Sequence, residues 1–294
     1  RSFLQNDGFV NKISSHIIKK VADKLTSLFE KERESYNKYW DEINPFVRYG
    51  CIREPKFFDR VKDAIVYKTT EGQFVTLKEY REKTGDTNKD RIFYVTDEKQ
   101  QAQYIKLFRE YGIEPVIMNT LIDNHFMQFL ETKEKDLKFT RVDSDISDIM
   151  KDSENKEENE KITGELEKIF RQAVGNDKLK VRVEALKSTS VPGMILLPEH
   201  SRRFQELSKL YGFAGPDAAS MFEQEQTLVL NSKNSLIKAI LKLSKNEERK
   251  GDVELICQHV YDLAILSHKQ LEPAAMTKFI DRSNVLLERI ANLA

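Results

Sequence analysis

The sequence predicts a mixed α/β and α+β fold, and three observations carry that prediction. Long stretches space their apolar residues three and four positions apart, which is the pattern of amphipathic helices. Between residues 91 and 142, short apolar segments alternate with such helices, as in a small parallel sheet. From residue 179 onward, strand-like alternation gives way to helical patterns that continue to the end of the 294 residues.

The first expected element is a long amphipathic helix. Its apolar residues recur at helical spacing between Val10 and Leu28, so the helix should run from about Val10 toward Trp40. Pro45 and Gly50 are expected to end it, because proline interrupts helical hydrogen bonding and glycine favours helix ends.

Two shorter helices should follow. Pro55 suits the first turn of a helix, where its missing N–H is not needed. Thr76 and Glu79 form a capping-box pattern, in which each side chain accepts a hydrogen bond from the backbone N–H of the other residue. Gly85 suits the end of that helix.

Between residues 91 and 142 the pattern is strand, helix, strand, helix, strand, which predicts a small parallel sheet. Such sheets bind ligands at the carboxyl ends of their strands. This segment has neither a Gly-x-Gly-x-x-Gly nor a Gly-Lys-Ser/Thr loop to hold phosphate, so we interpret it as a packing module, with a mononucleotide site as the alternative. The expected strands are 92–95, 115–118 and 137–142, and the expected helices are 97–111 and 122–130.

An acidic stretch separates the two halves of the chain. Residues 143–161 contain eight acidic and three basic side chains and few apolar ones. Residues 143–156 are therefore expected to be a linker between domains at 1–142 and 157–294. The second domain is expected to contain a helix from residue 162, strands at 179–185, 191–197 and 227–230, and helices at 236–243, 253–268 and 275–294.

The composition limits the classes of function. The chain has 48 basic and 48 acidic residues, so no overall positive field favours nucleic acid or an anionic membrane as a partner. The apolar runs are far shorter than the ~20 residues that span a bilayer. Cys51, Cys257 and the five histidines show no metal-ligand spacing, so no metal site is predicted. So few cysteines fit a cytoplasmic protein.

Several segments match one known family in the same order. Residues 1–5, Arg-Ser-Phe-Leu-Gln, are similar to a Ser-Arg-Glu-x-Leu-Gln segment, and the helix from Val10 follows it. Thr76–Tyr80, Arg91–Thr96 and residues 115–123 are similar to Leu-x-x-Tyr, Ile-Tyr-Tyr-Ile-Thr and Pro-Ile-Asp segments. Over essentially its whole length the chain resembles the heat-shock protein 90 family. The absence of a Glu-Glu-Val-Asp tail favours the bacterial HtpG type.

This resemblance implies a fragment of a longer ATP-dependent chaperone. Residues 1–142 would be the second part of the family's middle domain, and residues 157–294 its C-terminal dimerisation domain. ATP and Mg²⁺ are expected as cofactors of the full-length protein and not of this fragment, which is not expected to be an enzyme. Arg1 and Gln5 match the family's catalytic arginine and glutamine beside the γ-phosphate.

The resemblance also places a client-binding segment at residues 201–212. The segment has an apolar stripe on the side opposite Arg202 and other polar residues, and an exposed stripe would suit unfolded proteins. Ordinary core packing is the alternative interpretation. The expected client-binding residues are Phe204, Leu207, Leu210, Tyr211, Met221 and Phe222.

The last two helices are expected to form a homodimer interface. Each carries an apolar stripe, and two helices are half of a four-helix bundle that a symmetry-related copy can complete. The alternative is that both helices fold back onto the strands at 179–197. The expected interface residues are Val253, Ile256, Val260, Leu263, Met276, Phe279, Ile280, Leu286, Leu287 and Ile290.

The predicted function is that of a cytoplasmic chaperone that binds non-native client proteins as a homodimer, with no nucleic-acid or membrane partner. Two alternatives stay open at this point. The first is a nucleotide-binding enzyme domain with a regulatory dimerisation domain. The second is a dimeric adaptor without chaperone activity.

Overall fold

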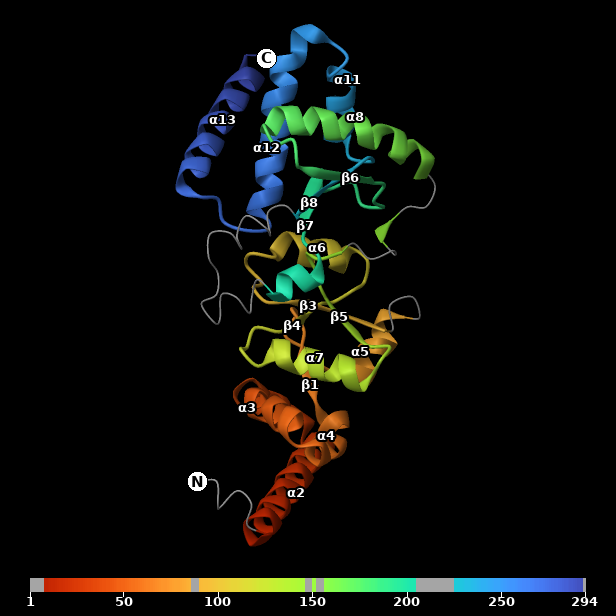
Figure 1. The fold of residues 1–294 in the computed structure, drawn as a ribbon, viewed down its shortest axis with the longest axis vertical. Coiled ribbons are helices and arrows are strands. Elements are labelled where there is room, and N and C mark those ends of the chain that lie inside the picture. The colour runs from red at the N-terminus through yellow and green to blue at the C-terminus, as the bar shows by residue number, and fades with distance from the viewer. Residues whose placement is uncertain (1–7, 86–89, 146–149, 152–155, 205–224, 293–294) are drawn as a thin grey trace. The chain divides into compact units, whose positions relative to one another are not determined.

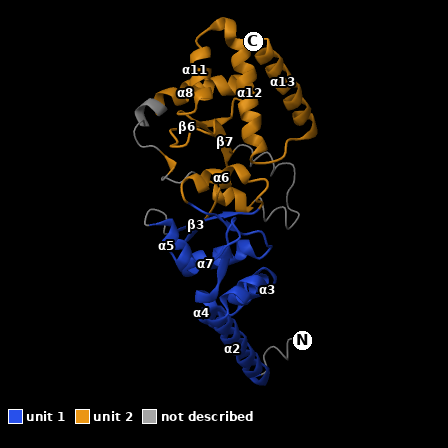
Figure 2. Cartoon of the chain, turned by 180° about the vertical axis from the view of Figure 1, so that it is seen from behind, with its two compact units in different colours: residues 1–96, 113–139 blue, residues 97–112, 140–294 orange. Residues whose placement is uncertain are grey.

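The chain divides into two compact units, which are distinguished by colour in Figure 2. Unit 1 comprises residues 1–96 and 113–139, and unit 2 comprises residues 97–112 and 140–294. Each unit has its own hydrophobic core. The computed structural model (Figure 1) describes residues 8–85, 90–145, 150–151, 156–204 and 225–292, and the side chains of these residues except at 156–159.

Unit 1 begins with helices in a different arrangement from the one expected. The predicted long helix is divided at Glu32, and its second part continues through Pro45 and Gly50 to Arg53, so the prediction that these two residues end it is wrong. Asn44 Nδ2 donates to the carbonyl oxygens of Asp41 at 3.1 Å and Trp40 at 3.0 Å. The side chain of Asn44 thereby replaces the donor that a proline lacks. The helices are α2 (Gly8–Lys31), α3 (Arg33–Arg53) and α4 (Pro55–Val61).

Two short sheets complete unit 1. Strands β1 and β2, which the sequence pattern did not indicate, pair antiparallel around a turn that contains Gly72. Strands β3 and β4 pair in parallel, in a sheet of order β4-β3-β5. The elements are η1 (Lys62–Ala64), β1 (Val66–Lys68), β2 (Phe74–Thr76), α5 (Leu77–Thr84), β3 (Arg91–Val95), β4 (Val116–Ile117), α7 (Asp123–Lys133) and the start of β5 (Lys138–Arg141), whose last two residues belong to unit 2.

The predicted capping box is confirmed at the start of α5. Thr76 Oγ1 accepts from the backbone N–H of Glu79 at 3.2 Å, and Glu79 Oε2 accepts from the backbone N–H of Thr76 at 2.6 Å. Gly85 ends the helix with a φ of 72°, which glycine adopts without strain.

Unit 2 packs helices against a mixed sheet. Its strands lie in the order β6-β8-β7, with β6 parallel and β7 antiparallel to β8. Helices α8 and α12 contact each other and this sheet, and together they form the core. The elements are α6 (Ala102–Glu110), α8 (Lys156–Val174), β6 (Lys180–Glu184), β7 (Gly193–Leu196), β8 (Thr227–Asn231), α11 (Ser235–Leu243), η5 (Glu247–Arg249), α12 (Lys250–Leu266) and α13 (Pro273–Ala291).

Parts of the predicted linker pack within unit 2. The carbonyl oxygen of Asp143 accepts from the N–H of Leu197 at 3.1 Å, and that of Met150 accepts from the N–H of Lys187 at 3.1 Å. Asp143 and Met150 are fully buried. The mixture of helices with parallel strand pairs confirms the α/β class that the sequence predicts.

Candidate functional site

The last two helices, α12 and α13, lie side by side (Figure 1). The ring of Phe279 stacks on His259, with centroids 4.9 Å apart and an angle of 2° between the planes. Arg282 on α13 donates to Asp262 at 2.5 Å and to Gln258 at 3.1 Å, both on α12. These contacts fix one side of α13 against its neighbour.

Another side of α13 is apolar and exposed. No residue within its described span, Pro273–Ala291, is buried. Ile280 is 50% exposed, and Leu287 and Ile290 are each 63% exposed. Ile280 and Leu287 are seven positions apart, which is nearly two helical turns, so they lie on the same side of the helix. We call Ile280, Leu287 and Ile290 the open face of α13.

The predicted interface residues divide between this open face and the core of unit 2. Val253 and Val260 are 5% and 1% exposed, because they pack in the core that α12 shares with α8. These two valines are covered by their own chain, whereas the open face is accessible to a partner. The remaining predicted interface residues lie on α12 and α13 and are partly or fully exposed: Ile256, Leu263, Met276, Phe279 and Leu286.

The structure describes only the start of the predicted client-binding segment. Residues 199–204 are helical, and Phe204 is 57% exposed. The sequence pattern places Arg202 on the polar side of the segment, and that placement is wrong, because Arg202 is only 4% exposed. The other predicted members lie outside the described residues: Leu207, Leu210, Tyr211, Met221 and Phe222.

Arg202 is buried because it belongs to a group of charged side chains that we call the Asp143 cluster: Asp143, Arg141, Arg202 and His268. Arg202 Nη2 lies 2.8 Å from Asp143 Oδ2, and Arg141 Nε lies 2.7 Å from Asp143 Oδ1. His268 Nδ1 lies 3.1 Å from Arg202 Nη2 and 3.5 Å from Asp143 Oδ2. A guanidinium only donates, so Nδ1 accepts from Arg202 and the imidazole is neutral.

Electrostatics agrees with this assignment of charges. Burial by itself raises the pKa of Asp143, but the attraction and the hydrogen bonds of Arg141, together with the attraction of Arg202, outweigh it, so the pKa lies well below its usual range. Burial lowers the pKa of His268, Asp143 acts in the opposite direction, and Arg202 and Arg141 add to the lowering. Sequence reasoning missed the cluster because its members come from three distant segments.

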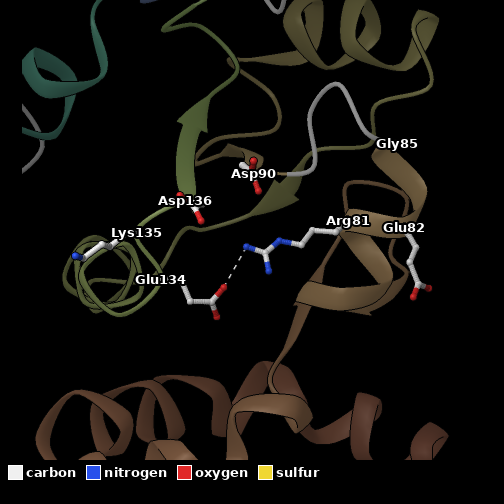
Figure 3. Close-up of a pocket in the computed structure, with 7 residues that line it drawn as sticks. All are labelled: Arg81, Glu82, Gly85, Asp90, Glu134, Lys135 and Asp136. Atoms are coloured by element: carbon white, nitrogen blue, oxygen red, sulfur yellow. Dashed lines mark hydrogen bonds and ion pairs between the residues drawn. The ribbon is translucent and has the colours of Figure 1, made fainter.

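Unit 1 contains an open hollow, of about 720 Å³, that bears on the nucleotide alternative (Figure 3). Figure 3 shows Arg81 extending toward Glu134, with which it forms an ion pair at 3.1 Å. Four carboxylates and two cations line the hollow, so its charge disfavours a triphosphate, and these residues do not fit ATP. The lining residues are Arg81, Glu82, Gly85, Asp90, Glu134, Lys135 and Asp136.

Three further sequence predictions concern ATP hydrolysis, metal binding and the membrane. Arg1 and Gln5 lie outside the described residues. Within the described parts of the chain, no three His, Cys, Asp or Glu side chains gather in a way that could hold a metal ion. None of the helices in those parts has the length and hydropathy of a membrane span.

Comparison with known proteins decides the family. A family model described as Hsp90 protein matches residues 1–293. The chain belongs to the Hsp90 family. Chaperone protein HtpG of Bacteroides thetaiotaomicron is 32% identical over 253 residues, which are 82% of this chain and 37% of that Hsp90 relative. Chaperone protein HtpG of Porphyromonas gingivalis is 30% identical over 268 residues, which are 87% of this chain and 39% of the relative.

The resemblance to HtpG-type Hsp90 proteins is therefore confirmed. A more distant Hsp90 relative, chaperone protein HtpG of Buchnera aphidicola, is 22% identical over 98% of this chain and 46% of its own length. The chain spans less than half the length of each of these relatives.

Proposed function

We propose that this chain is the middle-to-C-terminal part of an ATP-dependent chaperone of HtpG type, which acts in the cytoplasm as a homodimer and binds non-native proteins during stress. Membership of the Hsp90 family supports the chaperone class. The relatives' printed name, chaperone protein HtpG, supports it as well. In this proposal residues 1–142 belong to the middle domain, residues 143–156 form a linker, and residues 157–294 form the dimerisation domain.

The observation that carries the proposal is the open face of α13. A row of exposed apolar side chains is unfavourable in water, and burying it against a partner removes that cost. Pairing of α12 and α13 with the same helices of a second copy would complete four helices around a two-fold axis. Leu263, 42% exposed on α12, would add to the same interface.

Sedimentation velocity at micromolar concentration tests the dimer. The parent chain should sediment as a dimer, and Leu287→Asp should yield folded monomers, because it places an unpaired charge in a desolvated interface. Val285→Asp is the matched control. Val285 is 38% exposed on the same helix, and a rotation of about 200° separates it from Leu287. A monomeric parent, or identical behaviour of the two variants, contradicts the proposed interface.

The proposed client surface begins at Phe204 and continues through the further residues that the sequence predicts. An exposed aromatic ring suits the apolar segments that unfolded proteins present. The parent should suppress aggregation of a heat-denatured test protein, and Phe204→Ser should weaken that suppression. Leu236→Ser, at a 37% exposed leucine on α11, should leave it unchanged. A parent that dimerises without suppressing aggregation would favour the adaptor alternative.

ATP hydrolysis is proposed for the full-length protein, with ATP and Mg²⁺ bound upstream of this chain. The family resemblance supports Arg1 and Gln5 as residues that approach the γ-phosphate, where a guanidinium stabilises the charge that develops as the bond breaks. In the full-length protein, Arg1→Ala should slow hydrolysis by ~10³-fold and change ATP binding little. Unchanged turnover contradicts this role, and micromolar ATP affinity of the present chain contradicts the upstream placement.

A further inference from the structure

The Asp143 cluster joins the two surfaces on which the proposed function depends. Arg202 comes from helical residues 199–204, whose last residue is the exposed Phe204. His268 follows the end of α12, at the start of the connection to α13. Asp143 lies between them and contacts both side chains. All of these residues belong to unit 2, so the contacts lie within one compact unit.

We propose that Asp143 is a positioning residue that couples client binding at residues 199–204 to dimerisation through α12 and α13. This inference rests on the proposed function. Its physical basis is that Asp143 Oδ2 lies 2.8 Å from Arg202 Nη2 and 3.5 Å from His268 Nδ1, while Arg141 donates to both oxygens of the carboxylate. If Arg202 moves away, His268 Nδ1 loses its donor and the buried carboxylate loses a cation. A buried charge that loses a partner is costly, so the two segments move together.

Neighbouring contacts make this connection stiff. Glu199 Oε2 accepts from the backbone N–H of Arg141 at 2.9 Å, so residues 199–204 have a second link to the segment that carries Asp143. Gln100 Nε2 donates to the carbonyl oxygen of Leu266 at 2.8 Å, at the last residue of α12. Because both ends are held by additional hydrogen bonds, a displacement at Arg202 is transmitted to His268 and is not absorbed locally.

The coupling has a defined direction. A client bound at Phe204 restrains residues 199–204 and favours the arrangement in which Arg202 stays paired with Asp143. That arrangement also fixes His268 and therefore the start of the connection to α13. Client binding should accordingly tighten the dimer, and by linkage the dimer should bind clients more tightly by the same factor.

The test measures the dimer dissociation constant of the whole chain with and without a saturating unfolded protein, using reduced and carboxymethylated α-lactalbumin as the probe. In the parent, the probe should lower the constant by at least about fivefold, the lower end of typical coupling factors. In Asp143→Asn this factor should fall to about one. In the matched control Glu167→Gln it should persist, because Glu167 pairs with Arg171 within α8, at 2.6 Å, outside the Asp143 cluster.

His268→Leu is the second variant, and it tests the coupling between client binding and dimerisation if Asp143→Asn fails to fold. It removes a neutral ring and so leaves the buried charges unchanged. The coupling factor should again fall to about one, and hydrogen exchange at residues 199–204 should speed up although these residues are distant in the sequence. A factor that persists in the cluster variants, or unchanged exchange at residues 199–204 in His268→Leu, overturns the proposal.

The outcomes in the parent separate this inference from the proposed function. A parent that fails to bind the probe or to dimerise overturns the proposed function, and the coupling with it. A parent that does both, with a dimer constant that the probe does not change, overturns the coupling alone.

Discussion

The buried charges of the two units are arranged differently. In unit 1, Arg48 on α3 pairs with Asp123 on α7, and the side chains are 3% and 2% exposed. Thr120 donates to the same carboxylate through its N–H at 2.9 Å and its hydroxyl at 2.6 Å. The guanidinium also lies over the ring of Phe126, at 5.6 Å from its centroid. One cation and one anion thus join two helices.

The Asp143 cluster of unit 2 surrounds one carboxylate with two guanidiniums and a neutral imidazole. The simple pair in unit 1 is either intact or broken. In the cluster, Asp143 Oδ2 faces both Arg202 and His268, so protonation or movement can change which partner it binds. The Arg48–Asp123 pair therefore serves to hold two helices together. In the Asp143 cluster, one carboxylate faces two guanidiniums and an imidazole, so its contacts can change when one of these partners moves or is protonated.

The largest effect is expected from breaking the pair in unit 1. Asp123→Ala leaves Arg48 buried without a counter-charge and should destabilise unit 1 by about 3–5 kcal/mol. Trp40, the one tryptophan of the chain, is buried in unit 1, so its fluorescence during urea denaturation reports this unit. Asp41→Ala removes the partner of Lys68 at the surface and should cost about 1 kcal/mol or less. Equal effects of the two variants would contradict the comparison.

A somewhat smaller loss is expected in unit 2. Asp143→Asn keeps the shape and some hydrogen bonds but removes the negative charge between two guanidiniums, so unit 2 should lose about 3 kcal/mol. Circular dichroism should show the shifted transition while the Trp40 transition stays in place. Asp252→Asn is the control, because its carboxylate pairs with Arg249 and Arg289, whose side chains are both about half exposed. A shift of the Trp40 transition would mean that the cluster also stabilises unit 1.

Lowering the pH should destabilise unit 2 through His268. In folded unit 2 the pKa of His268 is lowered by burial, whereas in the unfolded chain it is about 6.5. Below about pH 6.5 the unfolded state therefore binds a proton that the folded state does not, and stability falls as the pH falls. The guanidiniums and Asp143 stay charged throughout this range.

Urea denaturation at pH 7 and pH 5 measures this loss. His268→Leu should lose less stability between the two values than the parent does, because it lacks the group that takes up the proton. The pKa of His259 in unit 2 is also lowered, so the difference between parent and variant isolates His268. Equal losses in the two proteins would show that His268 does not contribute to the pH dependence.

The smallest effect is expected at the capping box of unit 1. Thr76→Ala removes the acceptor for the N–H of Glu79 and should cost about 1 kcal/mol, measured by Trp40 fluorescence. Thr76→Ser keeps the hydroxyl and should cost much less. A loss in Thr76→Ala as large as that in Asp123→Ala would contradict the view that the buried pair dominates unit 1.

The sequence by itself determined the features that depend on near neighbours. The capping box, the end of the helix at Gly85, and most segment types were predicted, because these signals act over four residues or fewer. The continuation of α3 through Pro45 was not predicted, since it depends on the orientation of the Asn44 side chain. The parallel pairing of β3 with β4 was predicted from the alternation of strands and helices, and the structure confirms it.

Tertiary structure alone decided which apolar and charged residues are buried. Val253 and Ile280 have the same helical periodicity, yet they are 5% and 50% exposed, because α8 covers α12 whereas no described element covers the open face of α13. Arg202 and Arg203 are adjacent, but only Arg202 reaches Asp143. Periodicity gives the direction in which a side chain points along its own helix. What it meets there depends on residues distant in the sequence, which only folding brings close.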